Sequence, residues 1–144
     1  MSGYSSLMSA LRPGWLVSLS AAALLLASWM PWMVVAGGGR ASAIGGVVGE
    51  IAVRRHFGVG QLIVLMSAVL LVLGAMAARG ISARRAGMAA ATISVVIAVL
   101  IACYVKTVVQ APAVAGPGIY VGSICTLVAL ACSVWSVRDS PGRW

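Results

Sequence analysis

Four long apolar stretches constrain this chain more than any other feature of its sequence. They cover about residues 15–35, 57–78, 87–109 and 119–137. An α-helix needs ~20 residues, at ~1.5 Å each, to cross the hydrocarbon core of a bilayer. The chain is 62% hydrophobic and only 8% charged, whereas soluble domains carry roughly 25% charged residues. We therefore predict an all-α fold: an integral membrane bundle of four transmembrane helices that occupies residues 1–144 as a single domain.

The first stretch also has features of a secretory signal peptide, because Arg12 precedes the apolar run and small residues follow it. Its apolar run is longer than that of a typical signal peptide, and the bulky segment SWMPWM lies where cleavage would occur. Three further apolar stretches follow. We therefore interpret it as a retained transmembrane helix, which Pro31 is expected to kink or end because proline lacks an N–H group.

Basic residues predict the orientation, since Lys and Arg are enriched in cytoplasmic loops. With the N-terminus inside, six basic residues lie on the inner side and four on the outer side. The inner set is Arg12, Arg79, Arg84, Arg85, Arg138 and Arg143, and the outer set is Arg40, Arg54, Arg55 and Lys106. The sequence therefore predicts that the N- and C-termini are cytoplasmic and that residues 36–56 form an outer loop.

Tryptophans lie near both ends of the predicted spans, where their rings anchor helices at the membrane interface. Trp15 and Trp135 fall near the inner interface, and Trp29 and Trp32 near the outer one. We interpret all four as anchors of this kind.

The formal net charge of +8 would indicate nucleic acid as a partner if the protein were soluble. Here the basic residues lie between apolar stretches, so we expect lipid headgroups as partners and no nucleic acid. The candidate headgroup contacts are Arg84 and Arg85, in the ISARRAG turn, and Lys106, one turn from the end of the third stretch. A buried Lys106 that serves transport is the alternative.

Gly116 and Pro117 predict the start of the last helix, with Gly116 as its N-cap and Pro117 as its first residue.

Small side chains follow one face of the last stretch at spacings of 4, 3, 4, 3 and 4 residues. This seam consists of Gly118, Gly122, Cys125, Ala129, Cys132 and Ser136. In lipid, small residues let helix backbones approach closely, and packing drives association. A looser set that begins at Gly87 favours packing between the last two helices. The alternative is that the seam receives a helix of another protein or of a second copy.

Cys103 and Cys125 are a possible thiol pair, because each lies six residues from the outer end of its stretch. Both would then be ~9 Å deep in antiparallel helices, and a disulfide needs Cα atoms within ~7 Å. Four-helix enzymes that form disulfides with a quinone use a CxxC pair, which this sequence lacks. Buried cysteines commonly serve as small apolar residues.

No pattern in the sequence predicts catalysis. Glu50 and His56 are the candidates for proton chemistry in the outer loop, without a nucleophile or metal-ligand spacing near them. We interpret both as solvated, and we expect Glu50 to pair with Arg54 on a short surface helix. Small multidrug resistance transporters need an acidic residue in the first span, and every apolar stretch here lacks Asp and Glu. We expect no catalytic residue, no cofactor and no metal site.

Several short features are spread along the whole chain: RPGW before the first stretch, SWMPW at its outer end, a Gly/Ser-rich first loop, the basic turn, and GPGIYVG at the last stretch. In this layout the chain resembles small four-helix membrane proteins of actinobacteria, many of unknown function. The resemblance implies a multi-pass protein of the bacterial inner (plasma) membrane and no activity. Nine of the ten basic residues are Arg and Asn does not occur, which agrees with a GC-rich bacterial genome.

Abundant packing surface and the lack of acidic residues in the spans favour a non-enzymatic function. We expect an accessory or stabilising subunit of a larger membrane assembly. Its partners would be the lipid bilayer and other integral membrane proteins, or a second copy bound through the seam. The alternative is a small transporter or lipid-handling membrane protein, and a thiol-redox membrane enzyme is the third hypothesis.

Overall fold

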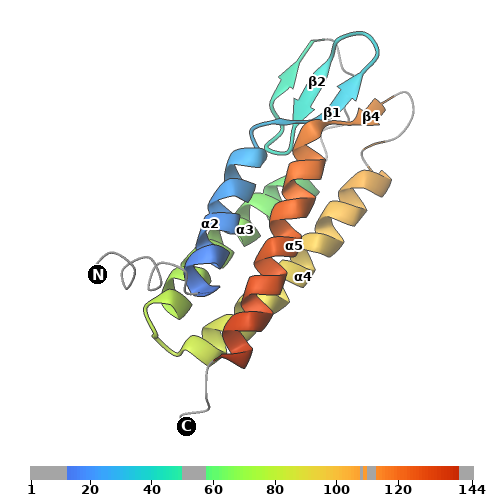
Figure 1. Ribbon diagram of the computed structural model, residues 1–144. Coiled ribbons are helices and arrows are strands. Elements are labelled where there is room, and N and C mark those ends of the chain that lie inside the picture. The colour runs from blue at the N-terminus through green and yellow to red at the C-terminus, as the bar shows by residue number, and fades with distance from the viewer. Residues whose placement is uncertain (1–12, 50–57, 108, 110–112, 140–144) are drawn as a thin grey trace, which may run out of the picture.

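The computed structural model describes residues 13–49, 58–107, 109 and 113–139. Within these residues, four α-helices lie side by side and a small sheet covers one end of them (Figure 1). The helices are α2 (Pro13–Ala27), α3 (Val59–Ala78), α4 (Ala83–Thr107) and α5 (Pro117–Arg138). The strands are β1 (Pro31–Val35), β2 (Arg40–Ser42), β3 (Val47–Val48) and β4 (Ala113–Ala115). We call the end with the sheet the sheet end, and the end where residues 79–82 join α3 to α4 the turn end.

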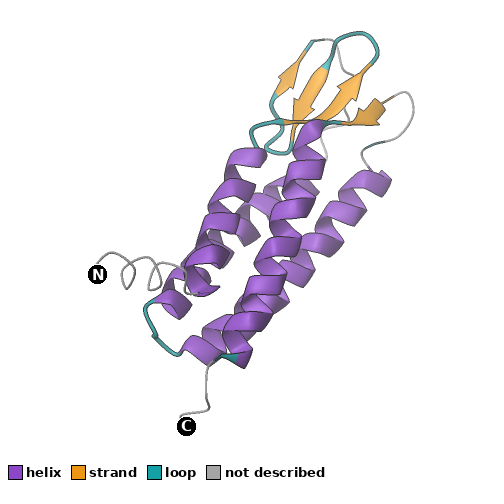
Figure 2. Cartoon of the chain, in the orientation of Figure 1, coloured by secondary structure: helices purple, strands orange, loops and turns teal. Residues whose placement is uncertain are grey.

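The helices form a closed ring, because each one packs against two others. α2 and α4 both contact α3 and α5. α2 and α4 run toward the sheet end, and α3 and α5 run back toward the turn end (Figure 1). All neighbours in the ring are therefore antiparallel, as in an up-down-up-down helix bundle. Figure 2 distinguishes these helices from the strands at the sheet end.

Three of the described helices, α3, α4 and α5, are long and apolar enough to cross a membrane. They contain 20, 25 and 22 residues, and ~20 residues suffice for a crossing. Large apolar side chains on their outer faces are exposed, among them Leu65, Val99 and Ile124. This distribution is consistent with a multi-pass membrane protein, since water would disfavour so much exposed apolar surface.

The first helix ends earlier than its apolar run predicts. α2 ends at Ala27, and β1 begins at Pro31, although the sequence predicted one span over residues 15–35. Pro31 ends helical hydrogen bonding, as expected. The valines that follow are β-branched and favour an extended backbone. A short apolar run fits a strand as well as a helix, so hydrophobicity alone did not separate the two.

The sheet corrects the prediction of an all-α fold. Its strand order is β3-β2-β1-β4, and every pair is antiparallel. The first three strands come from the connection between α2 and α3, and β4 comes from the connection between α4 and α5. The predicted outer loop therefore contains a strand hairpin, and the predicted surface helix with its pair Glu50 and Arg54 lies outside the described residues. The sheet joins both connections at one end of the bundle.

Glycine allows the helices to approach closely at the turn end. A Cβ atom on Gly14 of α2 would collide with the backbone of Ala78 in α3, and one on Gly74 would lie 2.7 Å from the backbone nitrogen of Ser18. Ser18 Oγ also donates a hydrogen bond to the carbonyl oxygen of Leu71, at 3.1 Å. Small residues and this interhelical bond thus hold α2 against α3, as expected for helices packed in lipid.

Candidate functional site

Trp32 occupies the centre of the sheet end. Its side chain is 0% exposed, and its ring lies edge-on to Tyr104 of α4, with centroids 5.3 Å apart and planes at 84°. The Trp32 carbonyl oxygen accepts a 2.8 Å hydrogen bond from the backbone N–H of Gly116, the residue before α5. Trp32 therefore links β1 to both α4 and α5. The prediction that Trp32 anchors the chain at the membrane interface was wrong, because its ring is enclosed by protein.

The glycine end of the predicted seam lies against this tryptophan. A Cβ atom on Gly118 would collide with the Trp32 indole. One on Gly122 would lie 3.2 Å from both Leu24 Cδ1 and Trp32 Cζ2. These two glycines therefore make room for Trp32 between β1 and α5, and they face the interior of the bundle.

The rest of the seam also lies on the inner face of α5, with one exception. Ala129, Cys132 and Ser136 are buried, whereas Cys125 is half-buried. At the turn end a Cβ atom on Gly87 of α4 would lie 3.5 Å from Ser136 Oγ. The seam thus meets α2 and Trp32 at one end and α4 at the other, within the same chain.

The other described tryptophans lie at the two ends of the bundle with much of their surface exposed. Trp15 and Trp135, near the turn end, are 41% and 52% exposed, and Trp29, near the sheet end, is 78% exposed. Exposed indoles at both ends are what interface anchoring requires.

The structure does not bring the candidate headgroup contacts together. Arg84 and Arg85 are exposed in the first turn of α4, at the turn end, and Lys106 is exposed in its last turn, at the sheet end. They lie near the two ends of one helix, where cationic side chains can reach lipid headgroups on opposite sides of a membrane.

The cysteines do not form a metal or redox centre in the described residues. Cys103 is exposed, Cys125 is half-buried and Cys132 is buried, and all three are free thiols. Within residues 13–49, 58–107, 109 and 113–139, no group of three or more His, Cys, Asp or Glu side chains could hold a metal ion. Glu50 and His56 lie outside these residues.

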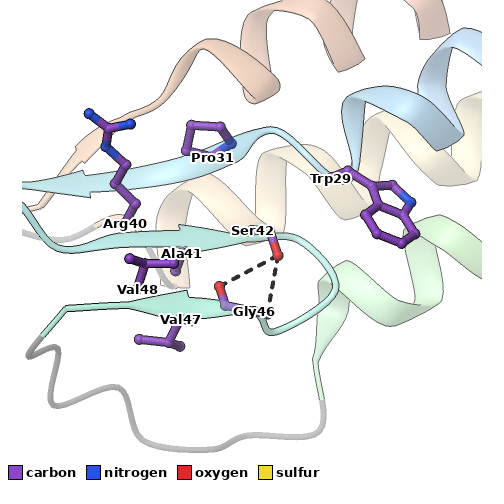
Figure 3. Close-up of a pocket in the computed structure, with 8 residues that line it drawn as sticks. All are labelled: Trp29, Pro31, Arg40, Ala41, Ser42, Gly46, Val47 and Val48. Carbon is purple, nitrogen blue, oxygen red and sulfur yellow. Dashed lines mark hydrogen bonds between the residues drawn. The ribbon is translucent and has the colours of Figure 1, made fainter.

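Sequence reasoning missed a pocket of about 330 Å³ on the sheet (Figure 3). It is lined by Trp29, Pro31, Arg40, Ala41, Ser42, Gly46, Val47 and Val48. Figure 3 shows Trp29 at one end of this group and Arg40 toward the other. The available signal was the short run ASAIGGVV, in which two glycines separate β-compatible segments, as in a hairpin.

The hairpin turn sets the position of the one hydroxyl in this pocket. Ser42 Oγ accepts a 3.1 Å hydrogen bond from the N–H of Gly46, and its bond to the Gly46 carbonyl oxygen is long, at 3.5 Å. Gly45, in the turn, has a φ of +95°, which glycine adopts without a steric penalty.

Comparisons with protein families, curated proteins and solved structures find no match to this chain. Its packing and its surfaces therefore carry the functional inference.

Proposed function

We propose that the protein is a non-enzymatic integral membrane protein that serves as an accessory or stabilising subunit of a larger membrane assembly. The observation that carries this proposal is the filled sheet end, where the fully buried Trp32 of β1 packs against α4 and α5. A filled interior leaves the outer surface of the bundle as the surface that can act on other molecules.

The buried hydroxyls support a structural role for the interior. Ser67, Ser94 and Ser133 each donate to the carbonyl oxygen four residues earlier, at 2.7, 2.8 and 2.7 Å. A hydroxyl bonded in this way satisfies its donor within its own helix. These side chains fill space in the interior, and their hydroxyl protons already take part in hydrogen bonds within their own helices.

A fourth membrane crossing by α2 is part of the proposal. α2 has 15 residues, or ~22 Å at ~1.5 Å per residue, less than the ~30 Å of a hydrocarbon core. Its close packing on α3 at Gly14 and Gly74 supports a shared membrane environment. Ser28 and Trp32 would extend the crossing beyond Ala27, because both are fully buried in the protein.

The charge distribution supports a cytoplasmic turn end. Among the described residues, Arg79, Arg84, Arg85 and Arg138 lie at that end, and Arg40 and Lys106 lie at the sheet end. The enrichment of basic residues in cytoplasmic loops then gives cytoplasmic termini and an outward sheet. The inner membrane of a bacterium is the location we propose.

The outward face of α5 is the surface we favour for a partner. Tyr120, Ile124 and Leu127 recur at the spacing of one helix face and are 63%, 62% and 63% exposed. A partner helix on this stripe would bury large side chains that the protein itself leaves uncovered.

Photo-cross-linking in native membranes tests this proposal. A photoreactive residue at Leu127 should cross-link to one protein in a discrete product. Matched probes at Leu65 on α3 and Val99 on α4, which are 55% and 56% exposed, should label mainly lipid. Lipid adducts alone at all three positions would contradict the accessory-subunit function.

A further inference from the structure

The pocket on the sheet combines a cation, a hydroxyl and an indole on one surface. Arg40 supplies a guanidinium, Ser42 a hydroxyl and Trp29 an exposed ring. Its volume of about 330 Å³ lies at the lower end of the range of ~300–1,000 Å³ that small-molecule pockets occupy. The pocket is therefore large enough for a small polar group with an apolar neighbour.

Strand register places Arg40 in an apolar row on the sheet. Arg40 lies opposite Val34 of β1 and Val48 of β3, and Val34 lies opposite Val114 of β4. Residues paired in this way share one face of a sheet. Val48 and Val114 are 71% and 66% exposed. The guanidinium thus has valine side chains on both sides, and Arg40 is the one charged residue among the described residues of the four strands.

The depth of the pocket matches that of lipid headgroups. α3 and α5 begin at Val59 and Pro117, at the sheet end, and both are long enough to cross a membrane. Trp29 lies two residues beyond the last residue of α2. The pocket therefore lies just beyond the apolar helix ends, in the zone where tryptophan is enriched and phosphate groups are concentrated. This holds for either orientation of the bundle.

The charges in the pocket favour an anionic headgroup. Its lining residues include one cation and no carboxylate. The only carboxylate among the described residues, Asp139, lies beyond α5 at the turn end. The planar guanidinium of an arginine donates two parallel hydrogen bonds to two oxygens of one phosphate. A cationic ammonium headgroup would instead need an acidic side chain as its partner. The long bond of Ser42 Oγ to Gly46 leaves its proton able to turn toward a ligand oxygen.

We propose that this pocket binds the headgroup of an anionic phospholipid of the phosphatidylglycerol type. The phosphate accepts hydrogen bonds from the Arg40 guanidinium and from the Ser42 hydroxyl, and the headgroup glycerol extends away from the helices. The first methylenes of the acyl chains lie on Trp29, toward the helix ends. The proposal goes beyond the accessory-subunit function and does not depend on a protein partner.

Photo-cross-linking with lipids of defined headgroup tests the site. The full chain is reconstituted in phosphatidylcholine vesicles that contain a photoreactive phosphatidylglycerol or the same probe on phosphatidylethanolamine. Mass spectrometry then maps the labelled peptides. The phosphatidylglycerol probe should label residues 29–48 more strongly. Arg40→Gln should reduce this labelling about tenfold or more, the effect expected for lost hydrogen bonds to a charged group.

Two further variants and a competitor sharpen the result. Arg40→Lys keeps the positive charge but cannot make two parallel hydrogen bonds to one phosphate, and it should give intermediate labelling. Arg79→Gln removes an exposed arginine at the turn end and should leave labelling of residues 29–48 unchanged. Equal labelling by both probes, or full labelling of both Arg40 variants, would overturn the proposal. Loss of labelling in excess glycerol phosphate would also overturn it, because the site would then bind a soluble phosphate ester.

Discussion

The indole Nε1 of Trp32 donates a 2.8 Å hydrogen bond to the carbonyl oxygen of Ala27, the last residue of α2. In a continuing helix, the N–H of residue 31 would bond to this oxygen. Residue 31 is proline, which has no N–H. This oxygen also accepts a 3.1 Å hydrogen bond from the backbone N–H of Met30, so the Trp32 indole is its second donor, and the indole bond holds β1 against the end of α2.

Replacing the buried Trp32 should destabilise the bundle far more than replacing the exposed Trp29. Trp32→Phe keeps an aromatic ring but loses the donor to Ala27, and it should lower the free energy of unfolding by about 1–3 kcal/mol. Trp32→Ala also leaves a cavity and should cost about 3–5 kcal/mol. Thermal unfolding in detergent measures both changes. Trp29→Phe is the control, and equal melting of Trp32→Phe and Trp29→Phe would refute the role of the hydrogen bond.

A leucine at Gly122 should weaken the contact between α5 and Trp32. The first added carbon would lie 3.2 Å from Trp32 Cζ2, so the ring or α5 has to move. Overpacking of this kind costs about 1–3 kcal/mol, whereas membrane insertion should remain normal because leucine favours lipid. Val128→Leu is the control, since Val128 is 44% exposed. Equal melting temperatures and expression for both variants would show that the seam does not need a small residue there.

A methyl group at Gly116 should loosen the sheet from the bundle. A Cβ atom there would collide with the carbonyl oxygen of Pro31, whereas one on Gly37 would meet nothing within 4 Å. Gly116→Ala should therefore cost about 1–3 kcal/mol. Gly37→Ala should leave stability unchanged or raise it by up to about 1 kcal/mol, by restricting the unfolded chain. Amide hydrogen exchange of residues 32–35 should rise in Gly116→Ala alone, and unchanged protection would contradict close packing of the sheet on the helices.

The helices could be predicted from the sequence, because membrane-length apolar runs determine them. α3, α4 and α5 lie at Val59–Ala78, Ala83–Thr107 and Pro117–Arg138, near the predicted spans. The last helix begins at Pro117 with Gly116 as its N-cap, so that prediction is confirmed. Proline and glycine have strong local preferences at helix starts, which explains why this boundary was accurate.

The sheet could not be predicted, because its pairing joins distant segments. Met33 of β1 lies opposite Ala115 of β4, and neither segment alternates clearly between polar and apolar residues. The position of Trp32 at the membrane interface was predicted wrongly for a related reason. A tryptophan at the end of an apolar run has the same sequence pattern whether it faces lipid or fills the bundle. Only the glycines of α5, placed against it by the fold, distinguish the two.

The thiols should be dispensable for folding. Cys103 and Cys125 are free in the structure, and replacing both with alanine removes little buried surface because Cys103 is exposed and Cys125 only half-buried. The melting temperature of the double variant should stay within a few degrees of the parent's, about 1 kcal/mol or less in stability. A disulfide between Cys103 and Cys125, detected by mass spectrometry of unreduced protein, would instead support the thiol-redox hypothesis.

Labelling from the two sides of the membrane tests the proposed four-crossing topology most directly. Single cysteines are introduced at Pro13, Gly37 and Ser82 in a cysteine-free background. Pro13 begins α2 and Ser82 lies in the turn before α4, whereas Gly37 is exposed between β1 and β2. In intact cells, a membrane-impermeant maleimide should label the Gly37 cysteine only, and a permeant reagent should label all three. Impermeant labelling at Ser82 would reverse the orientation, and impermeant labelling at both Pro13 and Gly37 would show that α2 does not cross the membrane.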